Sequence, residues 1–219
     1  MFVVYFASHP VRSLFALRYH YSYISSAAVK IGEDVLEVAG WGDYFVGGVG
    51  SASLPTQLGP FEVTHQAKSS KDHIFRVQIS AVEALLIKTF KDLVSIHIEG
   101  ASFSRFGSGV GLLGNFSNGV LVGRDGVTNM ERDVKAFGQE WQVRDTEPML
   151  FTIPRKPQYP TKCILPDDDT TVSGRRLGET LAQENAEKAC AHFSGDSHSV
   201  CVFDVLATGD QELAGAGFY

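Results

Sequence analysis

The chain has 219 residues, of which 44% are hydrophobic and 20% are charged, a balance typical of one sizeable globular domain with a small appendage. Its formal net charge of −6 argues against a nucleic-acid partner, because phosphate binding needs a basic surface. No apolar run approaches the roughly 20 residues of a membrane-spanning helix, so we expect no membrane-spanning segment in this chain.

The first residues form a short apolar stretch. Residues 2–7 read Phe-Val-Val-Tyr-Phe-Ala, and no basic residue precedes them. A signal peptide usually has a basic start and a longer apolar core. We therefore interpret this stretch as a β-strand.

From residue 19 to residue 98 the hydrophobic pattern has a period of two residues, which indicates strands with one buried face. Residues 29–31 and 36–38 flank Gly32-Glu33-Asp34, and this arrangement predicts a hairpin. Strands that follow one another with turns between them predict an antiparallel β-sandwich.

Two further stretches continue the alternation, at 75–79 and at 94–98, with a turn predicted at Lys91-Asp92. Between the predicted strands lie segments 41–54 and 64–72, which are rich in glycine, serine and polar residues. We predict that these two segments are loops that display side chains to a partner.

Residues 107–143 are the most distinctive part of the sequence. Four of their first eight residues are glycine, which lets backbones approach closely, so a point where strands cross is predicted rather than a flexible linker. A short strand is predicted at 120–122 and a turn at 123–126. Phe137 and Trp141 are predicted to be buried against the sheets.

Three motifs follow one another in this segment. They are Gly111-Leu112-Leu113-Gly114-Asn115-Phe116, Asp125-Gly126 and Phe137-Gly138-Gln139-Glu140-Trp141-Gln142-Val143. In order and spacing they resemble the von Willebrand factor type D (VWD) domain, whose pattern is G-L-C-G-N-[YF], a D-G turn and F-G-x-x-W-x-V. Leu113 replaces the motif cysteine, and the loop after Asn115 is largely apolar instead of acidic.

The resemblance spans about residues 20–145 and implies a VWD-like β-sandwich over residues 1–150. It also implies an extracellular or cell-surface location and a non-catalytic role in adhesion, matrix assembly or protein–protein interaction. Other extracellular proteins or matrix would then be the partners. The family's Asp-Pro-His opening and first strands have no counterpart, so an N-terminally incomplete domain is expected. The matching structural positions are Gly111, Gly114, Phe137, Gly138 and Trp141.

In many VWD domains the loop after G-N-[YF] supplies oxygen ligands for calcium, so the resemblance marks a degenerate calcium loop here. Its candidate ligands are Asn115, Ser117, Asn118 and Asp125. The apolar residues 120–122 stand where the family carries acidic residues, and tight calcium sites need several carboxylates. The alternative is that Asn115 satisfies backbone groups within its own turn. No other cofactor is expected.

Two other short patterns overlap this segment. Asn115-Phe116-Ser117 is a sequon for N-linked glycosylation, but a sequon inside a tightly packed motif is predicted to be a poor acceptor. Residues 109–114 fit G-x-G-x-x-G, yet turn-forming residues follow where a dinucleotide site needs a helix. Neither pattern is taken as a site.

The sequence carries no recognisable catalytic motif, and we predict that the chain is not an enzyme. None of its seven histidines has H-E-x-x-H spacing, and no G-x-S-x-G sequence is present. His97 points away from the apolar face of its predicted strand and is expected at the surface. The competing hypothesis is a hydrolase with a site assembled from dispersed residues, which a pocket with converging histidines and carboxylates would favour.

Beyond residue 150 we expect a linker at 151–162, which contains three prolines, and a small helical module at 163–219. Thr180 and Gln183 have the spacing of a capping box, which predicts a helix start. The apolar face of that helix would contain Leu181, Ala186, Ala189, Cys190 and Phe193. The acidic run 167–169 is predicted to be a solvated loop.

All three cysteines, at 163, 190 and 201, lie in the last part of the chain. An odd number leaves one without a partner within the chain, and buried free thiols remain an open alternative. The C-terminal part resembles a degenerate form of the cysteine-containing module that often follows VWD domains. That resemblance implies a disulfide between Cys190 and Cys201, with Cys163 free or bonded outside the chain.

Overall fold

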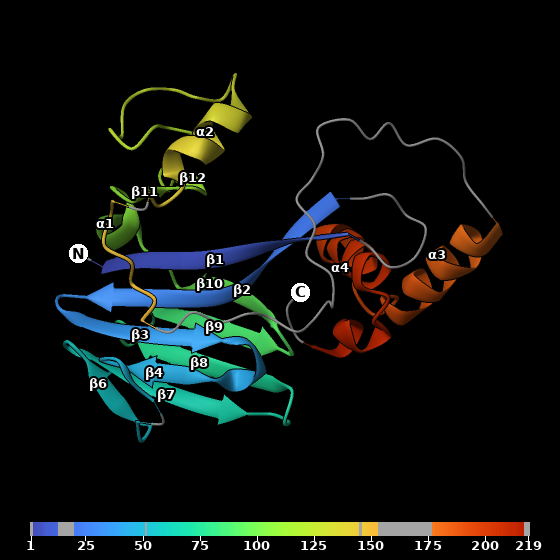
Figure 1. The fold of residues 1–219 in the computed structure, drawn as a ribbon, viewed down its shortest axis with the longest axis horizontal. Helices are drawn as coiled ribbons and strands as arrows, with labels where there is room; N and C mark the ends of the chain where they lie inside the picture. The colour runs from blue at the N-terminus through green and yellow to red at the C-terminus, as the bar shows by residue number, and fades with distance from the viewer. Residues whose placement is uncertain (1, 13–19, 51, 145, 153–176, 217–219) are drawn as a thin grey trace.

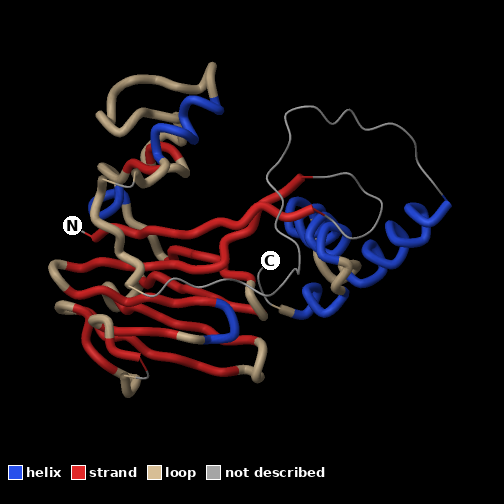
Figure 2. Tube along the Cα trace, in the orientation of Figure 1, coloured by secondary structure: helices blue, strands red, loops and turns tan. Residues whose placement is uncertain are grey.

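The structure is a computed structural model that describes residues 2–12, 20–50, 52–144, 146–152 and 177–216. In this part of the chain the strands form two five-stranded antiparallel sheets packed face to face, with a small two-stranded sheet beside them (Figure 1). Helices of the C-terminal part gather at one end of the strands (Figure 2). The fold is a β-sandwich followed by a small helical part, as the sequence predicts.

The first sheet is a meander in which each strand pairs with the next strand of the chain. It contains β1 (Phe2–Arg12), β2 (His20–Ile31), β3 (Asp34–Ala39), β4 (Tyr44–Val46) and β5 (Val49–Gly50). The predicted hairpin is confirmed, because Ile31 pairs with Asp34 and Gly32 takes the positive φ of 63° that the tight turn requires. β1 confirms the strand predicted at residues 2–7.

The second sheet repeats the same arrangement. It contains β6 (Thr56–Leu58), β7 (Phe61–Ala67), β8 (Asp72–Gln78), β9 (Ala84–Phe90) and β10 (Leu93–Glu99). The predicted turn at Lys91-Asp92 is confirmed, since Phe90 pairs with Leu93 around it. Lys91 has a φ of 53°, a conformation that few residues other than glycine adopt.

The main hydrophobic core lies between these two sheets. Its largest fully buried side chains come from both, namely Val29, Leu36, Val38, Leu58, Val63, Phe75, Val77, Leu85 and Ile87. Each contributes about 1.5–3 kcal/mol through burial. The alternation predicted at 75–79 is confirmed, whereas in β10 Val94 is buried and Ile98 is exposed.

Residues 103–141 form a separate unit outside the sandwich, here named the side unit (Figure 1). Its elements are α1 (Phe103–Phe106), β11 (Val110–Gly111), β12 (Gly114–Asn115) and α2 (Val134–Trp141). Phe106 anchors it, because this ring is buried within the core between the sheets. The side unit is thus attached at its first helix and extends away from the sheets.

Two buried carboxylates also tie outlying segments to the sandwich. Glu83 accepts hydrogen bonds from the Ser102 hydroxyl at 2.5 Å and from Arg105 Nε at 2.8 Å, and these bonds lower its pKa to about 2. Glu37 on β3 accepts from the backbone N–H of Thr152 at 3.0 Å and from its hydroxyl at 2.5 Å. The segment after the side unit therefore returns to the first sheet.

Three predictions about residues 107–143 are wrong. The glycine-rich stretch is a hairpin outside the sandwich and not a crossing point of its strands. The strand predicted at 120–122 is reduced to a single bridge between Val122 and Asn129. Phe137 and Trp141 do not pack against the sheets. Phe137 is buried, but it lies against half-buried Trp141 within the side unit and belongs to neither main core cluster. One turn of α2 separates these two rings, so they lie on the same face of the helix.

The helical module contains α3 (Leu177–Ala189), α4 (Gly195–Thr208) and the 3-10 helix η2 (Gln211–Gly215). The predicted capping box is wrong, because the chain is already helical at Leu177, upstream of Thr180. The predicted apolar face is confirmed at Ala186 and Cys190, which are fully buried.

A second hydrophobic cluster joins this module to the sandwich. Tyr23, Phe90 and Leu93 come from the strands. The module contributes Ala186, Cys190, Cys201, Val202, Val205, Leu213, Ala214 and Ala216. The sandwich and the module therefore share one buried interface, where β9 ends and β10 begins.

An ion cluster closes the same interface. Lys91 pairs with Asp210 and with Glu212, and Lys71 Nζ lies 2.9 Å from Glu212 Oε2. Burial lowers the pKa of Lys91, but its hydrogen bonds to the two carboxylates outweigh this effect and leave the pKa raised. The hydrogen bonds from Lys71 and Lys91 lower the pKa of Glu212 to about 2.

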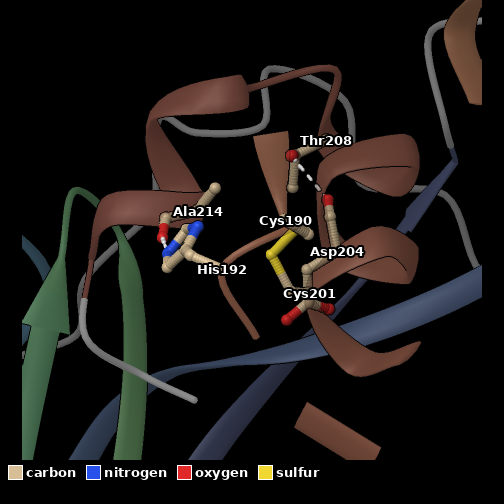
Figure 3. The surroundings of a disulfide bond; sticks show 6 residues. All are labelled: Cys190, His192, Cys201, Asp204, Thr208 and Ala214. Carbon is tan, nitrogen blue, oxygen red and sulfur yellow. Dashed lines mark hydrogen bonds between the residues drawn. A yellow bond between two sulfur atoms is a disulfide. The ribbon is translucent and has the colours of Figure 1, made fainter. Parts of the chain in front are cut away.

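The disulfide implied by the resemblance is present. Cys190, just after α3, is bonded to Cys201 in α4, and both are fully buried (Figure 3). Near it, His192 Nε2 donates to the carbonyl oxygen of Ala214 at 3.0 Å. The disulfide therefore joins the two helices, while His192 holds the following 3-10 helix.

Several predictions fall outside the described residues. They concern Cys163, the acidic run 167–169 and most of the linker 151–162, so the domain boundaries stay predictions. Within the described part of the chain, no helix is long and apolar enough to cross a membrane.

The ion cluster predicts a specific acid sensitivity. Because the pKa of Glu212 falls from an ordinary value of 4.5 to about 2 on folding, the stability it contributes is complete above pH 4.5. That stability disappears as the pH falls to about 2. The Glu212→Gln variant should be less stable than wild type to urea at neutral pH and match it at about pH 2. A constant difference at both pH values would contradict this assignment.

Candidate functional site

Three of the four predicted calcium ligands lie in one turn, where their oxygens serve the backbone. Asn115 Oδ1 accepts from the backbone N–H of Ser117 at 2.8 Å and from its hydroxyl at 2.6 Å. Asn118 Oδ1 accepts from the N–H of Val120 at 3.0 Å. These bonds are those of side chains that stabilise a turn, which favours the alternative interpretation of Asn115.

The fourth predicted ligand, Asp125, belongs to a different turn. Its Oδ1 accepts from the N–H groups of Val127 and Thr128 at 2.9 Å, and Oδ2 accepts from the Thr128 hydroxyl at 2.5 Å. The hydrogen bond from the Thr128 hydroxyl is the largest cause that lowers the pKa of Asp125 to about 2. Across the described residues, no group of three or more His, Cys, Asp or Glu side chains is placed to hold a metal ion.

The structure does bring the second and third motifs together. Glu140 accepts from the backbone N–H of Arg124 at 2.7 Å, and Trp141 Nε1 donates to the carbonyl oxygen of Val122 at 3.0 Å. The Arg124 guanidinium carbon lies 5.9 Å from the centroid of the Trp141 ring. The D-G turn and the F-G-x-x-W helix therefore form one packed element, in which Trp141 is a structural residue.

The glycines of the motifs differ in their roles. Gly114 has a φ of 87°, and a Cβ there would lie 2.9 Å from the carbonyl oxygen of Gly119, so only glycine fits. A Cβ at Gly111 or Gly138 would meet no atom within 4 Å. Residues 109–114 lie between α1 and a turn, and this geometry is not the strand-to-helix cradle that holds a phosphate.

A different site is built around Trp41, which the short 3-10 helix η1 (Gly40–Gly42) presents with 45% of its surface exposed. Trp41 has a φ of 62°, a left-handed conformation that is strained for a bulky residue. A Cβ at Gly40 would lie 2.4 Å from the Cα of Asp92, and one at Gly42 would lie 2.4 Å from the His73 ring. Both neighbours must therefore be glycine, and they fix the backbone that carries the indole.

A cluster of aromatic side chains lies next to η1, because the His73 ring packs against Gly42. His65 Nε2 lies 3.1 Å from His73 Nδ1, and the His65 ring stacks on Phe75 with 4.4 Å between centroids. Tyr44 lies 5.9 Å from His65, between centroids. Burial and the neighbouring His73 lower the pKa of His65. We name this set, with Gly40–Gly42, the Trp41 corner.

The Trp41 corner corrects the prediction of two display loops. Segment 41–54 contains η1, β4 and β5, and segment 64–72 consists of the end of β7 up to Ala67, a connection at 68–71 and the first residue of β8. Pairing between β7 and β8 places His65 and His73 on the same face, which sequence spacing alone did not reveal. The one signal in the sequence is the Gly-Trp-Gly triplet, in which glycines flank an aromatic residue.

His97 is half-buried, so its predicted surface position is confirmed only in part. Its Nε2 lies 2.9 Å from the Ser95 hydroxyl on the same strand. Burial, then the positive charge of Lys88, lowers its pKa. These effects disfavour the protonated form of His97 relative to a free imidazole.

Comparison with known proteins adds no assignment. No protein-family model matches the chain. A search of curated proteins finds no significant sequence match either. The site must therefore be interpreted from its own geometry.

The turn at Asp125 predicts how an alanine variant will respond to calcium. Asp125→Ala removes three hydrogen bonds within the turn, so it should lower the melting temperature. Because the role is structural, the decrease should be the same with calcium as with a chelator. Differential scanning fluorimetry under both conditions measures it, and Asp196→Ala in the first turn of α4 is a control carboxylate. A decrease seen only with calcium would restore the ligand interpretation.

The histidine pair predicts a loss of stability in weak acid. Since the pKa of His65 is lowered on folding, the unfolded chain binds a proton more readily. Stability should fall as the pH drops through the ordinary value of 6.5. His65→Phe preserves a ring that stacks on Phe75 and should flatten this part of the pH profile. Urea unfolding across the range, with His198→Phe as a control in α4, tests the assignment.

Proposed function

We propose that the chain is a non-catalytic extracellular interaction module of the VWD kind, acting in adhesion or matrix assembly, and that it contacts its partner through Trp41. Three features support this proposal. They are the resemblance of the side-unit motifs to VWD domains, the buried disulfide, and the geometry of the Trp41 corner. The last of these carries the argument.

The disulfide supports a location outside the reducing cytosol. Cys190 and Cys201 are bonded and both are fully buried, so they have a structural role in the helical module. Structural disulfides form and persist in oxidising compartments and are rare in cytosolic proteins. The bond also locks α3 to α4, which gives the module a defined surface against the sandwich.

The Trp41 corner supports a role in contact. Tryptophan is enriched among the residues that dominate binding energy at protein interfaces. Here a strained backbone keeps the indole half-exposed, and a left-handed residue costs about 1–2 kcal/mol. The hydrogen bond from the backbone N–H of Trp41 to the carbonyl oxygen of Lys91 holds this conformation. Strain retained at an exposed aromatic residue is typical of a functional position.

One observation favours the competing proposal of a hydrolase, namely the hydrogen-bonded pair His65 and His73 beside Trp41. A hydrolytic site would use one of them as a general base, with a bound substrate close to the pair. The two proposals differ in what a substitution of His65 does. Loss of turnover indicates an enzyme, and unchanged binding indicates an interaction module.

Substitution of Trp41 tests the proposal directly. Trp41→Gly fits the φ of 62° without strain, and this relief offsets the lost packing of a half-exposed ring. We expect the free energy of unfolding to stay within about 1 kcal/mol of wild type. Affinity for an immobilised extracellular-matrix extract, measured by biolayer interferometry, should fall by at least about tenfold.

Val82→Ala, at an exposed apolar residue away from the corner, should bind the extract as wild type does. The proposal fails if Trp41→Gly unfolds the chain, because the indole would then be structural. It also fails if wild type does not bind the extract, or if His65→Gln abolishes hydrolysis of ester or peptide substrates that wild type cleaves.

A further inference from the structure

The only N-x-[ST] sequence of the chain lies at Asn115-Phe116-Ser117. The structure overturns the expectation that this sequon is tightly packed. Phe116 and Ser117 are exposed and belong to the turn that follows β12, and Asn115, the last residue of β12, is half-buried. A glycan attached here would extend into solvent without displacing the sheets.

We propose that Asn115 carries an N-linked oligosaccharide that covers the exposed apolar residues of the hairpin. The inference rests on the proposed extracellular location. Its first support is the geometry of the Asn115 amide. Oδ1 accepts both bonds from Ser117, whereas within the described residues Nδ2 has no hydrogen-bond partner. The sugar is attached at Nδ2, so the turn keeps its hydrogen bonds after modification.

The apolar surface around Asn115 is the second support. Leu113 at the hairpin tip is 91% exposed, and Phe116, next to the acceptor, is 43% exposed. Val110, which pairs with Asn115 across the hairpin, and Leu112 are also exposed. We name Val110, Leu112, Leu113 and Phe116 the hairpin patch. Gathered apolar side chains on a surface favour association, so a covering group attached at their edge keeps the chain monomeric.

The modification requires a lipid-linked oligosaccharide diphosphate and a transferase of the secretory pathway. Asn115 Nδ2 attacks C1 of the first sugar, and a carbon–nitrogen bond forms. The bond from C1 to the phosphate oxygen breaks, and its electron pair leaves with the lipid diphosphate. Nδ2 gives up one proton to a base of the transferase. The side-chain carbonyl oxygen takes no part and stays free to accept from Ser117.

Expression of the full chain behind a heterologous secretion signal in a eukaryotic host tests the inference. Intact mass spectrometry should show one glycan, which an amidase specific for N-linked glycans removes with conversion of Asn115 to aspartate. Asn115→Asp keeps the oxygen that accepts from Ser117 but removes the attachment atom, so this variant should be unmodified. Ser117→Thr keeps the hydroxyl and should still be glycosylated, whereas Ser117→Ala should lose the glycan.

Two further readouts make every outcome decisive. Enzymatic removal of the glycan from folded protein should increase binding of an apolar dye and self-association on size-exclusion chromatography, and Leu113→Ser should reduce both effects. Unmodified wild type would overturn the inference. If the host secretes no protein, the chain retained inside its secretory pathway is analysed instead. A glycan whose removal changes neither readout overturns the covering role. The heterologous signal makes these results independent of whether the proposed location and function are correct.

Discussion

The turn between β9 and β10 is the point on which the arrangement of the other parts depends. Lys91 adopts a positive φ there, its N–H donates to Lys71 and its carbonyl oxygen accepts from Trp41. Its ammonium group pairs with Asp210 and Glu212 of the helical module. One residue therefore fixes the exposed indole and the helical module relative to the second sheet. Because the ammonium group is largely buried, its charge needs both carboxylates.

The sequence predicted the sandwich well because alternation is a local signal. Phe75 and Val77 are two residues apart, so they lie on the same face of their strand, and that face is buried. The turn residues between the strands were also recognisable in the sequence. The Cys190–Cys201 disulfide followed from the resemblance, and the structure contains it. Strand order also follows the chain, so no long crossover had to be inferred.

The side unit and the Trp41 corner were harder to predict because their contacts depend on register and on closely approaching backbone. Phe137 and Trp141 were expected against the sheets, yet α2 keeps them in contact with each other within the side unit, and it is Phe106 that enters the sandwich core. The pairing of His65 with His73 needs the register of β7 on β8. The strain at Trp41 needs the positions of Asp92 and His73, which no local pattern encodes.

The disulfide lies wholly within the helical module and closes a loop between residues 11 apart. Every cysteine of the chain follows residue 160, so strands β1 to β10 contain none. Reduction of this bond therefore removes a covalent link between α3 and α4 and removes none within the sandwich strands.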